Sequence, residues 1–157
     1  MLAAIRNFFD QHIAHREDEP AASIERRVQI AAAALLVEVA RSDQSFSDDE
    51  RHTVLESVRR KFNLGEVEAK ELLALAEAES REAHDLFQFT SKIDATFSPE
   101  RKAQLIEELW RAAYSDGVLH EHEEYLIRRV ADLLHVPHSG FIAAKLRVLA
   151  TRDPRTR

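Results

Sequence analysis

The sequence contains no cysteine, only three glycines and four prolines, and few aromatic residues. Without cysteine there is no disulfide framework, no thiol nucleophile and no thiolate zinc site of the finger type. Scarce glycine and proline, together with apolar residues gathered in long blocks of Ala, Leu, Ile and Val, argue against many short strands. These absences favour an all-α fold.

Excess positive charge and long apolar runs are also lacking. The net charge is -6, whereas a general nucleic-acid surface needs an excess of Lys and Arg to displace counterions from phosphates. The longest apolar block, residues 28–40, is interrupted by Gln29 and Glu38 and is too short to span a bilayer. The N-terminus shows no signal-peptide pattern. We therefore expect a cytoplasmic protein that does not bind nucleic acid.

The 157 residues fit one domain of ordinary size. Apolar residues recur at spacings of three and four, which predicts seven to eight helices. The predicted segments are an N-terminal amphipathic helix with an acidic linker (1–21), a helical domain (22–150) and a basic tail (151–157).

The N-terminal helix carries its apolar side chains on one face. Either this stripe packs across the rest of the domain, or it docks a partner protein or a membrane surface. Its one clearly basic residue, Arg6, gives little attraction to an anionic membrane. The stripe consists of Leu2, Ile5, Phe8, Phe9 and Ile13.

Polar residues mark the expected helix ends. Ser23 is a predicted N-cap, Ser47 and Glu50 have the spacing of a capping box, and Ser98 precedes a proline at the first helical position. The core is expected to include Val67 and Leu72 in the fourth helix and Phe141, Ile142, Leu146 and Leu149 in the last helix.

Two segments, 39–64 and 112–136, have the same construction. In each, an apolar helix runs into Ser-Asp, a short turn follows, and the next helix opens with Glu as its third residue. Asp43 and Glu50 correspond to Asp116 and Glu123 at identical spacing. This predicts an internal duplication of a three-helix unit, with repeat one at about 23–81, a bridging helix at 83–96 and repeat two at 98–150. An approximate two-fold axis would bring the two turns together.

The paired aspartates suggest what the turns do. Each lies at the C-terminal end of a helix, where the macrodipole disfavours a carboxylate. Each should therefore interact with turn amides, with the N-terminus of the next helix or with a cation. Clustered carboxylates suit Ca²⁺ or Mg²⁺. The second turn adds His120 and His122, which with Asp116 would suit Zn²⁺, Mn²⁺ or Ni²⁺. Neither turn has EF-hand spacing, and no nucleotide or nucleophile motif is present.

The stretch SDGVLHEHEEYLIRRVADLLHV resembles the TerB-like family of bacterial proteins, named from tellurite resistance. The resemblance covers about residues 22–149. It implies an all-helical domain with an internal repeat, similar in fold to the N-terminal domain of membrane-anchored DnaJ-like co-chaperones. It further implies a place in the cytoplasm or at the inner membrane, a role in tellurite or general stress resistance, and an acidic surface that holds a divalent metal.

The family's acidic positions fall on Asp43, Glu50, Asp116 and Glu123. Gln44 stands where the family has glycine, and His120 and His122 replace the commoner hydroxyl and acidic residues at those places.

The leading hypothesis is a non-enzymatic module that binds other proteins, with a divalent cation (Ca, Mg, Mn or Zn) between its acidic turns. One alternative is a metal-independent, co-chaperone-like adaptor that docks through its N-terminal helix. Another is a metal-dependent hydrolase, which requires a pocket beside both turns. The oligomeric state is left open.

Overall fold

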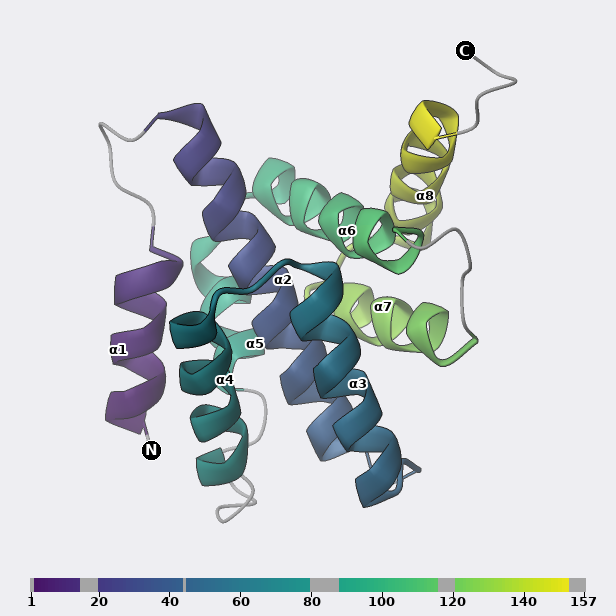
Figure 1. Cartoon of the computed structure of the whole chain (residues 1–157). Coiled ribbons are helices and arrows are strands. Elements are labelled where there is room, and N and C mark those ends of the chain that lie inside the picture. The colour runs from purple at the N-terminus through teal and green to yellow at the C-terminus, as the bar shows by residue number, and fades with distance from the viewer. Residues whose placement is uncertain (1, 15–19, 44, 80–87, 116–120, 153–157) are drawn as a thin grey trace.

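The computed structural model describes residues 2–14, 20–43, 45–79, 88–115 and 121–152, and these form eight helices and no strand (Figure 1). The prediction of an all-α fold is confirmed. The helices are α1 (Leu2–His12), α2 (Ala21–Ser42), α3 (Asp48–Lys61), α4 (Glu66–Glu79), α5 (Gln88–Thr96), α6 (Pro99–Ala113), α7 (Glu121–Leu133) and α8 (His138–Arg152).

Helix α2 is the centre of the molecule. Its second half is buried almost all round, and the helix contacts α1, α3, α4, α5, α6 and α7. Four consecutive alanines, Ala31 to Ala34, let these neighbours approach closely in a well-packed interior. Among the described residues no helix, α2 included, is both long enough and apolar enough to cross a membrane.

The two predicted repeats pack in parallel ways. Helix α2 contacts α3 and α4, α6 contacts α7 and α8, and α2 and α6 pack against each other. Helices α3 and α7 also end alike, with Asn63 (φ 53°) and His135 (φ 61°) in the left-handed region. The following N–H, of Leu64 or Val136, donates to a carbonyl five residues earlier at 3.1 or 2.9 Å, as in a Schellman motif. These likenesses are what a duplication predicts, and the duplication itself stays a prediction.

Helix α1 packs against α2, α4 and α5. Its Phe8, Phe9 and Ile13 are buried, and Phe8 meets the ring of Phe89 edge-on at 5.6 Å between centroids. The apolar stripe of α1 therefore belongs to the core over its described side chains.

Most predicted helix ends are confirmed. Ser47 and Glu50 form the capping box of α3, and Ser98 caps α6. The N-cap assigned to Ser23 is wrong, because α2 already begins at Ala21. Its first turn is closed by the Pro20 carbonyl, which accepts the N–H of Ser23 at 3.0 Å. The bridging helix is observed from Gln88, and residues 80–87 lie outside the described residues.

Two expected core residues are exposed. Val67 on α4 is 67% exposed, because it lies on the opposite side of the helix from the buried Leu72. Leu146 on α8 is 59% exposed, because α8 buries the face that carries Ala144 and Val148 instead. Burial of Phe141 is confirmed, and Ile142 and Leu149 are partly buried.

Candidate functional site

The first acidic turn begins where α2 ends, at Asp43. One carboxylate oxygen of Asp43, Oδ1, accepts hydrogen bonds from the backbone N–H of Ser45 at 2.9 Å and from its hydroxyl at 2.6 Å. This is the Asx-turn expected of an aspartate beyond a helix C-terminus. The other oxygen, Oδ2, accepts the Tyr125 hydroxyl at 2.7 Å. Because Tyr125 lies on α7, the first turn contacts the helix that follows the second turn.

These contacts hold Asp43 in its ionised form. Partial burial raises the pKa of Asp43, but the hydrogen bonds from Ser45 and Tyr125 and the charge of Arg129 outweigh burial and lower it below 3.8. Tyr125 responds in the opposite direction. Its bond to Asp43, followed by burial and the Asp43 charge, raises its pKa above 10.0.

Glu50 acts within its own turn. Its carboxylate accepts the Ser47 backbone N–H at 2.7 Å, and the Ser47 hydroxyl accepts the Glu50 N–H at 3.1 Å. The bonds to the Ser47 backbone and hydroxyl lower the pKa of Glu50 below 4.5, with a smaller contribution from the nearby His122. Glu50 therefore caps α3 as a carboxylate.

Glu123 lies in a more enclosed place, at the start of α7. Its Oε2 accepts Lys61 Nζ at 2.6 Å, and the two side chains are only 14% and 4% exposed. Lys61 also donates to the carbonyl of Ala113 at 3.2 Å, at the last residue of α6. The ammonium group of Lys61 thus joins the ends of α3 and α6 to the first turn of α7, and it supplies a positive charge beside Glu123.

Sequence reasoning did not identify Lys61. A signal was available, because Lys61 follows Val54 and Val58 at helical spacing and so continues the apolar stripe of α3. A lysine in such a stripe usually needs a buried partner. Its partner is 62 positions away in the chain, so the spacing alone could not name Glu123.

A small pocket lies beside this ion pair. Leu126 and Ile127 form part of its apolar wall, and Ser57 and His122 contribute polar groups near Lys61 and Glu123. The pocket volume is about 20 Å³, which is room for about one water molecule.

The structure gives only part of the geometry that a metal site would need. Asp43, Glu50 and Glu123 bond respectively to Tyr125, Ser47 and Lys61. Within the described residues, no group of three or more His, Asp or Glu side chains is spaced to hold a metal ion. His122 lies next to Glu123 on α7, whereas the predicted ligands Asp116 and His120 lie outside the described residues. The metal site therefore stays a prediction.

A second buried carboxylate has a structural role. Glu38, about one turn before the C-terminal end of α2, is 1% exposed. Its oxygens accept the backbone N–H groups of Phe89 and Thr90 at 2.9 and 3.0 Å and the Thr90 hydroxyl at 2.7 Å. These amides open α5, so Glu38 caps that helix from a distance and faces the positive end of its dipole. Glu38 therefore interrupts the apolar block of α2 at the point where α2 meets the N-terminus of α5.

Comparison with known proteins gives one family match. A family model described as "Tellurite resistance protein TerB" matches residues 29–146, which is more than half of the chain. No curated protein and no solved structure matches. The matched span runs from α2 into α8 and includes both acidic turns.

Proposed function

The chain belongs to the TerB family of tellurite resistance proteins, and on that premise we propose that it is a non-enzymatic module that binds partner proteins and holds a divalent cation at its paired acidic turns. The setting proposed for it is bacterial tellurite or stress resistance, in the cytoplasm or at the inner membrane.

The contact between Asp43 and Tyr125 carries this proposal. Their 2.7 Å hydrogen bond brings the first turn against α7, two residues beyond Glu123. A cation shared between the turns requires this kind of approach, because protein oxygen ligands lie within about 2.6 Å of Ca²⁺ or Mg²⁺. The lowered pKa of Asp43 supports the same proposal, since a ligand carboxylate must be ionised.

The charge of Lys61 limits which carboxylates take part. Lys61 Nζ lies 2.6 Å from Glu123, so the Glu123 carboxylate already has a cationic partner within the protein. We therefore assign the leading ligand roles to Asp43 and Asp116, with His120 and His122 contributing if the ion is Zn²⁺ or Mn²⁺. Glu50 and Glu123 would then orient the two turns.

Isothermal calorimetry of the metal-free protein tests the cation. Titration with Ca²⁺, Mg²⁺, Mn²⁺ or Zn²⁺ should give saturable heat with at least one ion, and the double variant Asp43→Asn, Asp116→Asn should lose it. Asp49→Asn is the matched control, because Asp49 is an exposed carboxylate in the first turn of α3. Absence of heat with all four ions, or equal heat in the double variant, contradicts the cation site.

The alternatives remain distinguishable. An adaptor that docks through α1 must expose Phe8, Phe9 and Ile13, which are buried, so partner binding would require α1 to detach. A metal-dependent hydrolase needs a substrate cleft beside both turns, whereas the pocket at Glu123 has room for about one water molecule. The binding module therefore has the stronger support.

A further inference from the structure

A pocket of about 180 Å³ opens between α3 and α4. Its apolar lining consists of Leu55 from α3, Leu64 from the turn that follows, and Ala69 and Leu72 from α4. Leu72 is buried, whereas the other three are partly exposed and so can be reached from the surface. An apolar cavity of about 150 Å³ is known to hold one benzene molecule. The pocket therefore has room for one aromatic ring.

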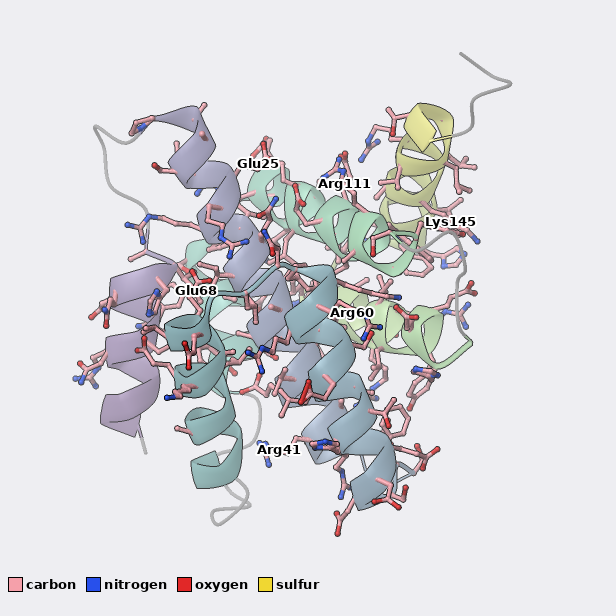
Figure 2. All side chains as sticks on the ribbon, in the orientation of Figure 1. Glu25, Arg41, Arg60, Glu68, Arg111 and Lys145 are labelled. Atoms are coloured by element: carbon pink, nitrogen blue, oxygen red, sulfur yellow. The ribbon has the colours of Figure 1, made fainter. Side chains whose placement is uncertain are left out.

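Charged side chains border the opening of this pocket. Glu56 and Arg59 come from α3, and Glu66 and Lys70 come from α4. Glu66 and Lys70 are 79% and 78% exposed, so they lie at the opening and do not fill the interior. The neighbouring Arg60 is not part of the lining, and Figure 2 shows it on the side of α3 toward α7. An apolar centre within a polar rim is typical of a site that buries one anchoring side chain of a partner protein.

Helix α8 shows which side chain can stand at the corresponding position. The first turns of α4 and α8 close in the same way, because the Ala69 N–H donates to the Gly65 carbonyl at 2.9 Å and the Phe141 N–H donates to the Pro137 carbonyl at 3.0 Å. Ala69 and Phe141 are thus each the fourth residue of their helix. Where α4 carries a methyl group, α8 carries a phenyl ring.

The ring of Phe141 is buried against the helices that precede α8. Its centroid lies 5.0 Å from that of Trp110 on α6 and 5.9 Å from the guanidinium carbon of Arg128 on α7. Arg128 is the eighth residue of α7, and the eighth residue of α3 is Leu55, which lines the pocket. The pocket therefore lies between the helical positions that the Phe141 ring joins in α7 and α8, and Ala69 is too small to fill it.

We propose that this pocket binds a phenylalanine side chain of a partner protein. The inference rests on the partner-binding role proposed above and deepens it by naming the site and its ligand. The partner's ring takes the place beside Leu55 and Ala69 that the Phe141 ring takes beside Arg128, where it is removed from water. Because the pocket opens at the surface, the rest of the partner chain stays outside, against the charged rim.

Methyl NMR of the full chain tests the site with a defined probe. N-acetyl-phenylalaninamide carries the phenylalanine side chain on a capped backbone and should progressively shift the methyl signals of Leu55, Leu64 and Leu72. Binding of a single ring is expected to be weak, in the millimolar range. N-acetyl-alaninamide is the matched probe without a ring and should leave these signals in place.

Three results of this titration overturn the proposal. The first is the absence of a progressive shift with the phenylalanine probe, and the second is an equal shift with the alanine probe. The third is a shift with toluene and none with the phenylalanine probe, which would assign the pocket to a free aromatic molecule.

Filling the pocket from within gives a second measurement. Ala69→Phe places a ring at the position that Phe141 has in α8, so it should raise the melting temperature and remove the response to the probe. Ala74→Phe is the matched control, because Ala74 is an exposed alanine of the same helix outside the pocket, and it should leave the response unchanged. A folded Ala69→Phe protein that still responds contradicts the site. If this variant does not fold, the titration of the wild-type chain still decides.

Failure of this site and failure of the cation site give different results. The calorimetric titration depends on Asp43 and Asp116, whereas the NMR titration reads the leucine methyl groups between α3 and α4. Unshifted methyl signals together with saturable cation heat would remove the phenylalanine site alone. Shifted methyl signals without cation heat would remove the cation site and leave the docking site standing.

Discussion

Asp43 shows how one carboxylate can serve two distant parts of the chain. Its Oδ1 closes the local turn through Ser45, and its Oδ2 accepts the hydroxyl of Tyr125 from α7. The first contact follows from the position of Asp43 beyond a helix end. The second follows from the packing of α7 beside that end, and it makes the residue a link between the two halves.

The lowered pKa of Asp43 predicts a pH-dependent contribution to stability. Because the folded protein binds this proton less tightly than the unfolded chain, the stabilisation is complete well above pH 3.8 and is lost as the pH falls through the folded pKa. Asp43→Asn should lower the free energy of unfolding by about 1 kcal/mol at pH 7 and by much less at about pH 2. Urea denaturation across this range checks it, with Asp49→Asn as the control. An equal loss at both pH values would contradict the prediction.

The hydrogen-bond partners of the acidic residues were predictable from sequence only where those partners lie within the same turn. Ser47 and Glu50 meet within one turn, so their spacing was sufficient to predict the capping box. The partners of Asp43 and Glu123 come from other helices, 82 and 62 positions away. A single sequence gives no register between such distant segments, and therefore Tyr125 and Lys61 were missed.

At the scale of helices, the pair Lys61–Glu123 fixes how α3 sits against α6 and α7. A buried ion pair is costly to desolvate, and its net contribution to stability is often close to zero. Its role is better seen when one partner is removed, because the remaining charge stays buried and loses its partner at 2.6 Å. The same ammonium also satisfies the carbonyl of Ala113 at the end of α6.

A double-mutant cycle tests this coupling between helices. Lys61→Met alone should lower the free energy of unfolding by about 3–5 kcal/mol, since it leaves the Glu123 carboxylate buried. Combining it with Glu123→Leu should recover most of that loss, because both charges are then replaced by apolar groups of similar volume. Chemical denaturation of the two single variants and the double variant gives the coupling energy. Additive losses would mean that the two side chains act independently.

The sequence predicted where the helices lie more reliably than it predicted which face of each helix is buried. The apolar spacing and the capping residues predicted the elements, although Pro20 rather than Ser23 precedes the first turn of α2. Orientation failed for Val67 and Leu146 because α4 and α8 carry apolar residues on more than one side. Only the position of neighbouring helices decides which of two apolar faces becomes buried.

At the scale of the whole molecule, α1 completes the core. Phe8, Phe9 and Ile13 fill the side of the bundle formed by α2, α4 and α5. The amphipathic sequence of α1 allowed two interpretations, packing across the domain or docking to a partner or membrane. Phe8, Phe9 and Ile13 follow the first, because all three are buried. His12 adds a bond to Glu71 on α4 at 3.2 Å.

Substitution in α1 should therefore destabilise the entire domain. Phe8→Ala should lower the free energy of unfolding by about 3–5 kcal/mol, as expected for a buried phenylalanine whose removal leaves a cavity. Asp10→Ala, at an exposed site on the same helix, should have little effect. Thermal unfolding with light scattering provides the measurement. A Phe8→Ala protein with an unchanged melting temperature would instead identify α1 as a detachable docking helix.

The carboxylate of Glu38 also constrains when parts of the chain can become native. During synthesis α2 emerges well before α5, yet the three donors whose hydrogen bonds Glu38 accepts belong to Phe89 and Thr90. Until those residues have been made, α2 carries a polar carboxyl group on a face that is buried in the folded protein. The native contacts of Glu38 therefore cannot form until more than half of the chain has been made.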